Sequence, residues 1–428
     1  MTISSSSSST TSFSYEFGGP IGALATTLAL PVVVMLLAHW TDVGALDIPD
    51  LVYLAFPTTA TTTIMDTMVM AKCTLGLLAW FVLLVLLWAL LPGRIVQGAP
   101  IHGNKKHTLG YKLNGHLTFW VVVVGVLGFR LPLNEYLYEY YEPLALCDIL
   151  LCFALSLYMY VRSFSSNVVL AKGGDSGNLI YDYFMGRELN PRLGFFDWKV
   201  FCELRPGLIG WMLLNWACAL EQQKTQGSIS GSMWFINLSQ ALYVWDALYQ
   251  ERAILTTMDV TTDGFGYMLV FGDLAWVPFT YTVPAKYLVH YDPHLTKWQL
   301  TAIVALYGLG FVVFRGANGQ KDMFRRNPND PKVAHLSYLQ TKRGTRLLTS
   351  GWWGMARKIN YTGDYIMGLT YSLVCGVDSI VPYYYAVYFA ILLIHRSIRD
   401  DDMCHEKYGD DWVEYKRQVP YRFIPGIV

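Results

Sequence analysis

The stretch AKCTLGLLAWFVLLVLLWALL at residues 71–91 decides the fold class, because nearly every residue in it is apolar. It has the roughly 20 residues that a helix needs to cross the hydrocarbon core of a bilayer. Comparable windows cover residues 21–40, 117–134, 143–161, 204–222, 232–250, 264–285, 296–314, 364–377 and 379–395. The sequence therefore predicts an all-α, polytopic membrane protein with about ten transmembrane helices.

The composition supports this fold class. Hydrophobic residues make up 53% of the chain and charged residues only 15%, against about a quarter in an ordinary soluble domain. The formal net charge is zero, so nothing in the overall balance points to a nucleic-acid partner. The seven cysteines are scattered without a C-x-x-C pair. We therefore expect small core residues rather than disulfides or a zinc site.

The chain divides into three parts by sequence. Residues 1–20 are Ser-rich and lack a basic segment before the first apolar window, so we expect a disordered tail rather than a cleaved signal peptide. Residues 21–250 hold about six of the predicted helices and a long loop at 162–203. Within that loop, GDSGNLIYDYFMGRELNPRLG at 174–194 is too long for a bare connector. We interpret it as a structural collar or a gate. Residues 251–428 hold the remaining helices and the polar tail.

The positions of the basic residues predict the orientation in the membrane. With a cytosolic amino terminus and ten helices, 26 of the 32 Lys and Arg residues fall on the cytosolic side, as the positive-inside tendency favours. Both termini are then cytosolic. The two most basic segments, 315–358 and the tail from 396, flank the last two helices. A helical hairpin would bring these segments together.

The first basic segment has two interpretations. Lys321 and Arg325 lie four residues apart and would share one face of a helix. They would contact either anionic lipid headgroups or a bound phosphate. The following stretch LLTSGWWGMARKINYTGDYIMG at 347–368 contains paired tryptophans, glycines, Asn360 and Tyr361. These residues favour the phosphate site, because a lipid-facing loop rarely needs them.

The second basic segment is LLIHRSIRDDDMCHEKYGDDW at 392–412. If the helix continues beyond residue 394, Arg396 and Asp400 lie one turn apart, and Cys404 follows one turn later. The remaining acids form an ordinary solvated face: Asp401, Asp402, Asp410 and Asp411. The spacing of His395, Cys404 and His405 matches no known ligand pattern, so we expect no metal.

Fingerprints of common nucleotide folds are missing from the sequence. It contains no P-loop and no G-x-S-x-G elbow. Gly308 and Gly310 lie inside an apolar window rather than after a strand, which is typical of packing glycines. Two acids in apolar windows, Asp246 and Asp273, must face a partner or a cavity.

Two long motifs resemble a known family. GNLIYDYFMGRELNPR at 177–192 and LLIHRSIRDDDMCHEKYG at 392–409 closely resemble the two signature motifs of the sterol reductases, membrane enzymes that use NADPH. The likeness extends from about residue 71 to residue 428. Within the family, the stretches at 254–282, 314–321 and 347–364 and the ending YRFIPGIV look most like the fungal sterol carbon-14 reductases and the related domain of the lamin B receptor.

The resemblance implies an NADPH pocket that faces the cytosol and is built from the carboxy-terminal half of the chain. The matching positions are Lys321, Arg325, Leu348, Trp353, Asn360, Tyr361, Asp400, the segment from Cys404 through Lys407 to Tyr408, and Tyr415. Arg396 also matches the signature, either beside the cofactor or beside Asp400.

The resemblance also implies a reaction in ergosterol or other sterol biosynthesis. A proton would add to carbon 15 of the sterol, and hydride from NADPH would then reach carbon 14. The implied acids are Tyr243 and Asp400, with Asp246 as an alternative, and burial would raise the pKa of either. By position, Phe271 and Trp276 would line an apolar cavity for the sterol.

Several alternatives stay open at this point. The chain could reduce the C7 or C24(28) bond, serve as a non-catalytic sterol-binding scaffold, or be a membrane methyltransferase that binds S-adenosylmethionine. The resemblance implies location in the endoplasmic reticulum membrane or the outer nuclear membrane. The implied partners are a sterol taken from the bilayer, membrane lipids and other sterol biosynthesis enzymes.

Overall fold

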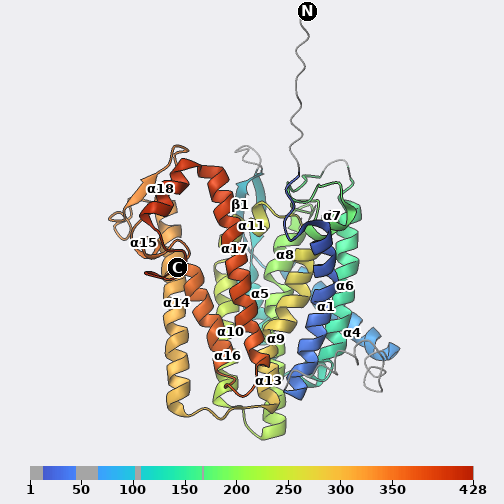
Figure 1. The fold of residues 1–428 in the computed structure, drawn as a ribbon. Helices are drawn as coiled ribbons and strands as arrows, with labels where there is room; N and C mark the ends of the chain where they lie inside the picture. The colour runs from blue at the N-terminus through green and yellow to red at the C-terminus, as the bar shows by residue number, and fades with distance from the viewer. Residues whose placement is uncertain (1–12, 45–65, 102–107, 166–167, 428) are drawn as a thin grey trace, which may run out of the picture. The chain divides into compact units, whose positions relative to one another are not determined.

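The computed structural model describes residues 13–44, 66–101, 108–165 and 168–427. Residues 1–12, the greater part of the expected Ser-rich tail, lie outside this description. The described chain is mostly helical (Figure 1) and forms two compact units. Unit 1 comprises 1–40, 47–221 and 237–282, and unit 2 comprises 41–46, 222–236 and 283–428.

Unit 1 holds most of the amino-terminal helices. Its elements are α1 (Gly19–Val43), α4 (Thr67–Leu90), β1 (Arg94–Pro100), β2 (Thr108–Leu113), α5 (Gly115–Gly128), the π-helix η2 (Asn134–Tyr138), α6 (Tyr141–Arg162), α7 (Leu179–Met185), β3 (Arg192–Leu193), β4 (Phe196–Asp197), α8 (Trp198–Leu204), α9 (Pro206–Gln226), α10 (Gly231–Tyr249), η3 (Glu251–Thr256), α11 (Met258–Thr261), α12 (Tyr267–Phe271) and the π-helix η4 (Gly272–Thr280). The ends of α1 and α9 and the start of α10 belong to unit 2.

Unit 2 holds the carboxy-terminal helices. Its elements are α13 (Val283–His290), α14 (Lys297–Arg326), β5 (Tyr338–Gln340), β6 (Arg346–Leu348), α15 (Trp352–Met355), α16 (Ile359–Leu373), η5 (Val381–Tyr383), α17 (Tyr384–Tyr408) and α18 (Asp410–Gln418). Helix α16 packs against both α14 and α17. This three-helix packing brings the two basic segments together.

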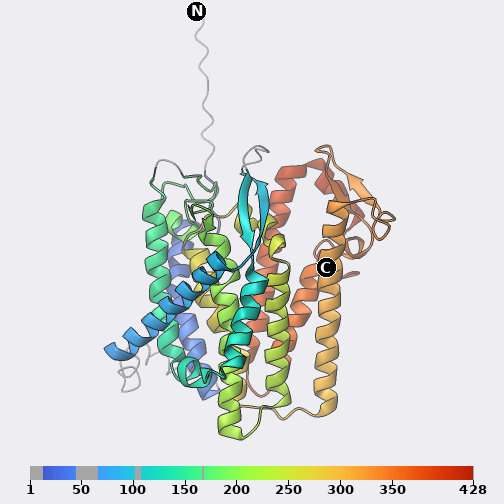
Figure 2. The same cartoon turned by 180° about the vertical axis from the view of Figure 1, so that it is seen from behind.

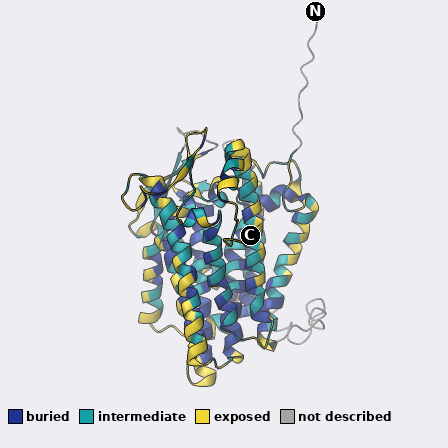
Figure 3. Cartoon of the chain, turned by 60° about the vertical axis from the view of Figure 1, so that its left-hand side comes forward, coloured by how far each residue is buried: buried dark blue, intermediate teal, exposed yellow. Residues whose placement is uncertain are grey.

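Each apolar window predicted from sequence coincides at least in part with a helix, although several windows extend beyond the helix ends. Within the described ranges, four helices, α1, α4, α6 and α14, are long and apolar enough to cross a membrane. Apolar side chains are exposed along α4, as at Leu75, Val82 and Leu90, and exposed positions on the outer helical surfaces are visible in Figure 3. Such surfaces suit contact with lipid. The chain is a membrane protein, and the number of ten crossings stays a prediction.

The structure differs from an all-α fold in three short antiparallel hairpins, β1–β2, β3–β4 and β5–β6. The largest, β1–β2, lies between the predicted windows at 71–91 and 117–134 (Figure 2). Two predicted windows are also irregular. Helix α5 ends at Gly128, four residues before Pro132, and the window at 264–285 becomes α12, the π-helix η4 and α13. A proline removes a backbone donor and distorts a helix, and Pro278 lies inside η4.

The end of the predicted tail is ordered in unit 1. The ring of Tyr15 lies 4.8 Å from that of Tyr181 in an edge-on contact, and the backbone N–H of Glu16 donates to the Tyr181 hydroxyl at 2.9 Å. The expectation of disorder is therefore wrong for this short stretch. Its aromatic residues pack against Tyr181 of α7, although Tyr15 stays 44% exposed.

The loop at 174–194 is fixed by its own hydrogen bonds. The Asn178 side chain accepts from two N–H groups at the start of α7, both at 3.1 Å. The Asp182 carboxylate accepts from the Ser176 backbone at 2.8 Å and its hydroxyl at 2.7 Å. Gly186 has φ of +84°, and a Cβ there would lie 2.1 Å from the backbone N of Gly266. Only glycine fits this backbone contact.

Close packing of α14 and α16 depends on two glycines. A Cβ on Gly310 would lie 2.8 Å from the carbonyl oxygen of Gly363, and a Cβ on Gly363 would lie 2.5 Å from the backbone N of Phe314. The interpretation of Gly310 as a packing glycine is confirmed. Gly308, by contrast, has open space at its Cβ position, so the packing interpretation is wrong for that residue.

Candidate functional site

Helix α14 and helix α17 present the basic residues of unit 2 on regular helical faces. Helix α14 begins with a capping box between Thr296 and Gln299 and continues without interruption to Arg326. Lys321 and Arg325 therefore lie one turn apart on it. Helix α17 continues to Tyr408, so Arg396, Asp400 and Cys404 occupy successive turns. The sequence analysis required that residues 321–325 be helical and that the last long helix continue beyond residue 394. Both expectations are confirmed.

Lys321 rests on an aromatic surface. Its Nζ lies 4.1 Å from the centroid of the Trp353 ring, a distance at which a cation and an aromatic face attract. The Trp353 indole donates to the carbonyl oxygen of Ala317 at 2.8 Å, which fixes the ring. Leu348 and Phe324 belong to the same buried cluster beneath it. Lys321 is thus held in place by packing.

An ion pair joins the start of α16 to the end of α17. Lys358 Nζ contacts the carboxylate of Asp400, and the two side chains are only 13% and 30% exposed. Arg396 and Lys321 also interact with Asp400 electrostatically, and Lys321 interacts with Arg325 and Lys358. We call Lys321, Arg325, Lys358, Arg396 and Asp400 the basic cluster. It holds four cationic side chains and one carboxylate.

The protonation of Asp400 differs from expectation. Burial raises the pKa of its carboxyl, but the charge and hydrogen bond of Lys358, with the charges of Lys321 and Arg396, outweigh burial and hold the pKa below its ordinary value. The expected raised pKa is therefore wrong. At neutral pH Asp400 is therefore a carboxylate and holds no proton that it could donate. The expectation took account of burial but not of Lys358, which faces the carboxylate.

Two polar residues of α16 lie beside this cluster. The amide nitrogen of Asn360 donates to Asn318 Oδ1 on α14 at 3.3 Å. Its oxygen is buried and accepts no hydrogen bond from the described residues. The Tyr361 ring lies 5.6 Å from Lys358 Nζ. A buried amide oxygen without a donor is a position where a ligand can bind.

Aromatic rings continue the site along α17 and α18. The ring of Trp412 stacks on Tyr408, with centroids 6.3 Å apart, and on Tyr415 at 5.1 Å. Cys404 packs against this cluster. Burial, followed by the charge of Asp400, raises the pKa of the Cys404 thiol to about 11. Burial likewise raises the pKa of Tyr415. Both groups are therefore neutral at physiological pH.

Lys407 lies at the exposed edge of these rings. Its Nζ is 5.0 Å from the Tyr408 centroid, and its carbonyl oxygen accepts from Arg343 at 3.0 Å. In the described part of the chain, no group of three His, Cys, Asp or Glu side chains is placed to hold a metal ion.

The aspartates that we assigned to a solvated face partly have structural roles. Asp401 accepts from the Trp412 indole at 3.0 Å and lies 3.4 Å from Lys416 Nζ. Asp411 accepts from the backbone N–H of Lys342 at 2.6 Å. Arg357 donates to the carbonyl oxygens of Val419 and Pro420 at 2.6 and 2.7 Å. These contacts attach α18 and the chain end to the rest of unit 2.

The expected proton donors Tyr243 and Asp246 belong to unit 1. They lie one turn apart on α10, and Asp246 is buried. The Tyr243 ring contacts Trp211 edge-on, with centroids 6.1 Å apart. The Trp211 indole donates to Gln240 at 3.0 Å, so the aromatic surroundings of Tyr243 are held by hydrogen bonds within unit 1.

Phe271 and Trp276 are packed core residues. They are 0% and 6% exposed, and their ring centroids lie 6.4 Å apart. A cavity within unit 1 is lined by their neighbours Leu274, Pro278 and Phe279 but not by these two rings. We expected Phe271 and Trp276 to line an apolar cavity, but they do not line this one. Their assignment to a sterol site stays a prediction.

Sequence reasoning missed Lys358, the partner of Asp400, and Asn318, the partner of Asn360. Lys358 stands in the quoted segment at 347–368 next to Asn360 and Tyr361. Its place immediately before the polar start of α16 is a signal that could have identified it.

Comparison with known proteins shows similarity over nearly the whole chain. The model of the "Ergosterol biosynthesis ERG4/ERG24 family" matches residues 11–428. Delta(14)-sterol reductase erg24 of Schizosaccharomyces pombe is 45% identical over 97% of this chain and 97% of its own length. Delta(14)-sterol reductase TM7SF2 of Mus musculus is 44% identical over 96% and 97%. Delta(14)-sterol reductase LBR of Gallus gallus is 43% identical over 96% of this chain and 63% of its own length.

Proposed function

The chain belongs to the ergosterol biosynthesis ERG4/ERG24 family, and on that premise we propose that it is an NADPH-dependent oxidoreductase that reduces the C14=C15 double bond of a sterol intermediate. The names of its relatives support the bond. The single observation in the structure that supports the cofactor is the basic cluster, in which Lys358, Lys321 and Arg396 interact with Asp400 and Arg325 interacts with Lys321.

The residues of this cluster fit a nucleotide with several phosphates. Arg325 is exposed at the end of α14, where its planar guanidinium can bind a phosphate through two hydrogen bonds. Lys321 provides a second positive charge held over Trp353. The free oxygen of Asn360 and the rings of Tyr361, Tyr408 and Tyr415 provide acceptors and stacking surfaces for an amide or a base.

Bound NADPH would supply the hydride that reaches carbon 14. An isolated double bond is not polarised, so a proton must add to carbon 15 first and leave a cation at carbon 14. Since Asp400 is ionised, we assign it to electrostatic stabilisation of that cation rather than to proton donation. Proton donation is then the role of Tyr243, with Asp246 one turn away as the alternative acid.

The location follows from the same proposal. A membrane protein of sterol biosynthesis would act in the endoplasmic reticulum membrane, with both termini and the basic cluster on the cytosolic side, where NADPH is available. The sterol would enter from the bilayer. Membrane lipids and other sterol biosynthesis enzymes are the partners that this location predicts.

The test is product analysis by mass spectrometry on the purified full-length protein in detergent. We expect NADPH-dependent saturation of the 14 bond of an 8,14-diene sterol, with no turnover of 7-ene and 24(28)-ene sterols. Asp400→Ala should abolish the product. Turnover of another bond would overturn the assignment of the bond. Binding of sterol without turnover of any of the three would favour a scaffold.

A further inference from the structure

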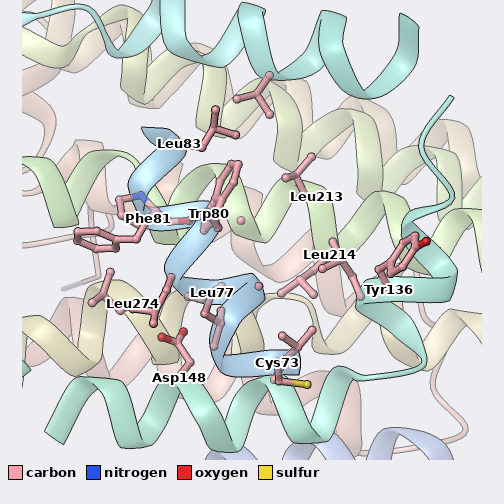
Figure 4. Close-up of a pocket in the computed structure, with 18 of the residues that line it drawn as sticks. Cys73, Leu77, Trp80, Phe81, Leu83, Tyr136, Asp148, Leu213, Leu214 and Leu274 are labelled. Carbon is pink, nitrogen blue, oxygen red and sulfur yellow. Dashed lines mark hydrogen bonds between the residues drawn. The ribbon is translucent and has the colours of Figure 1, made fainter. Parts of the chain in front are cut away.

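Unit 1 contains a cavity of about 1050 Å³ that the proposed reaction does not use. Its walls come from α4, α5, η2, α6, α8, α9 and η4 (Figure 4). None of the residues of the basic cluster lines it, nor do Tyr243 and Asp246. Pockets for small ligands usually measure about 300 to 1,000 Å³, so this cavity has room for an entire lipid-sized molecule.

The lining is apolar and partly aromatic. Figure 4 shows Leu77, Phe81, Leu213 and Leu274 around the space, with Trp80 on the same wall. The Trp80 indole already donates to the carbonyl oxygen of Pro206 at 3.3 Å. Most of the surface that a ligand would touch is therefore hydrocarbon or aromatic ring, which favours a rigid apolar molecule.

Two charged side chains, Asp148 and Lys72, interrupt this apolar lining. Asp148 on α6 points toward the cavity (Figure 4), and no side chain or backbone group among the described residues forms a hydrogen bond or an ion pair with it. A carboxyl group in apolar surroundings without a hydrogen-bonding partner is unfavourable. The Trp198 indole also lines the cavity, and its buried Nε1 has no acceptor in the described part of the chain.

Three glycines keep the cavity open. At Gly76 on α4 and Gly125 on α5, no atom lies within 4 Å of the position that a Cβ would occupy. At Gly210 on α9, the nearest atoms lie at ordinary contact distances of 3.9 and 4.0 Å. All three residues line the cavity. The space exists because three different helices lack side chains that would fill it.

We propose that this cavity is a second lipid site, which binds a sterol. The apolar lining would contact the fused rings of the sterol, and one hydrogen bond would join the sterol hydroxyl to Asp148. A sterol combines a flat apolar body with a single hydroxyl group, and this matches the lining and its one carboxyl group. A plain acyl chain would leave Asp148 without a partner. The site goes beyond the proposed reduction and does not depend on it.

The test uses photolabelling of the purified full-length protein in phosphatidylcholine nanodiscs. The probe is a cholesterol analogue with a diazirine in ring B and a terminal alkyne, applied without NADPH, and labelled peptides are located by mass spectrometry. We expect labelling within α4, α5 and α6. Gly76→Leu and Gly125→Leu should each abolish this labelling, because either side chain would extend into open space and occupy the cavity.

Gly128→Leu is the matched control. Gly128 lies on the same helix as Gly125 and also has open space at its Cβ position, but it does not line the cavity, so labelling should persist. Since Gly76 and Gly125 are on different helices, failure of one variant to fold leaves the other informative. Elution as a single peak in size-exclusion chromatography identifies folded protein.

The role of Asp148 has its own readout. Cholesterol should compete with the probe about two- to tenfold better than cholesterol 3-methyl ether, the range expected for one hydrogen bond. Asp148→Leu should remove this preference. Unchanged labelling in both glycine variants would overturn the proposal. So would labelling of the same peptides by a photoreactive phosphatidylcholine that cholesterol fails to displace. Sterol reduction by the same variants is measured in a separate assay. A failure of the proposed reductase function can therefore be distinguished from a failure of the proposed second sterol site.

Discussion

Two charged regions of this protein differ in how their charges are balanced. In unit 1, four arginines each pair with an acid, and we call these pairs the paired cluster: Arg162–Glu188, Arg187–Asp175, Arg192–Asp197 and Arg205–Glu251, at 2.6 to 3.2 Å. In unit 2, three cations of the basic cluster interact with the single carboxylate of Asp400, and the fourth, Arg325, interacts with Lys321. The paired cluster balances itself, whereas the basic cluster carries excess positive charge.

Under the proposed function, this difference separates a structural role of the paired cluster from a binding role of the basic cluster. Lys199, beside the paired cluster, is fully buried, and its Nζ donates to three carbonyl oxygens at 2.6 to 3.1 Å. Burial lowers its pKa to about 8, and the complete set of acceptors leaves no site for a ligand. Like charges held together in the basic cluster repel one another until an anion binds. We therefore expect mutations in the two clusters to affect different measurements.

The largest effect is expected in the paired cluster. Arg205→Met would leave the buried carboxylate of Glu251 without its cation, and also remove a hydrogen bond to Asn114 at 2.9 Å. Breaking a buried ion pair costs about 3–5 kcal/mol. We expect a strongly lowered Tm in detergent, measured by fluorescence-detected unfolding. Arg417→Met, which breaks the exposed pair with Glu414, should leave Tm unchanged, and equal Tm values for both variants would contradict the structural role.

The next effect concerns cofactor affinity. Lys321→Ala or Arg325→Ala should weaken NADPH binding by about 1.5–3 kcal/mol, the range for a hydrogen bond to a charged group, while NADH binding changes much less. The reason is the extra 2'-phosphate of NADPH. Isothermal titration with both nucleotides measures the difference. Arg326→Ala is the control, because Arg326 is paired with Asp322 at 2.7 Å. Equal losses for the two nucleotides would refute the assignment.

A smaller effect concerns the pH dependence of sterol reduction. Lys358→Met removes the main charge that opposes burial, so the pKa of Asp400 should rise. If the reaction needs the carboxylate, the acid limb of the kcat/KM profile should move to higher pH. Lys342→Met, which breaks a fully solvated pair with Asp410, should not move it. An unchanged acid limb in Lys358→Met would mean that ionised Asp400 is not required.

The same ion pair has a consequence for stability. Because the pKa of Asp400 in the folded protein lies below its ordinary value, the pair stabilises the fold at neutral pH. This contribution is fully present at pH values above the pKa that Asp400 has in the unfolded chain. It is lost as the pH falls through the lower pKa that Asp400 has in the folded protein. The Lys358→Met variant lacks this ion pair. Its free energy of unfolding should therefore fall less between neutral and acidic pH than that of the unsubstituted protein.

The smallest effect is on thiol reactivity. With a pKa of about 11, Cys404 should react with iodoacetamide far more slowly at pH 8 than an ordinary exposed thiol, because only the thiolate reacts. Asp400→Asn removes a charge that raises this pKa, so alkylation should become faster. Mass spectrometry of the Cys404 peptide measures the rate. An Asp402→Asn variant, which changes an exposed acid, should leave the rate unchanged.

Much of the fold could be predicted from the sequence. The apolar windows are local properties of composition, and a segment that must satisfy its backbone within a bilayer becomes a helix. The helical register of Lys321 with Arg325, and of Arg396 with Asp400, follows from the same local rule. The irregular course of 264–285 was missed because a proline such as Pro278 overrides the average hydrophobicity of a window. The β1–β2 hairpin was missed because it lies between two windows, where the hydrophobicity pattern predicts no structure.

The sequence predicted the helical faces that Lys321 shares with Arg325 and Arg396 shares with Asp400, but not the electrostatics around Asp400. The sequence by itself determined that this is a helical membrane protein with two basic segments, since hydrophobicity and charge are properties of single residues. Only the tertiary structure decided that Lys358 faces Asp400 across 42 positions of sequence, which reverses the expected direction of the pKa shift. Only the tertiary structure, likewise, decided that Asp148 borders an open space. A cavity forms where the side chains of separate helices leave space between them, and the sequence of one helix does not determine this.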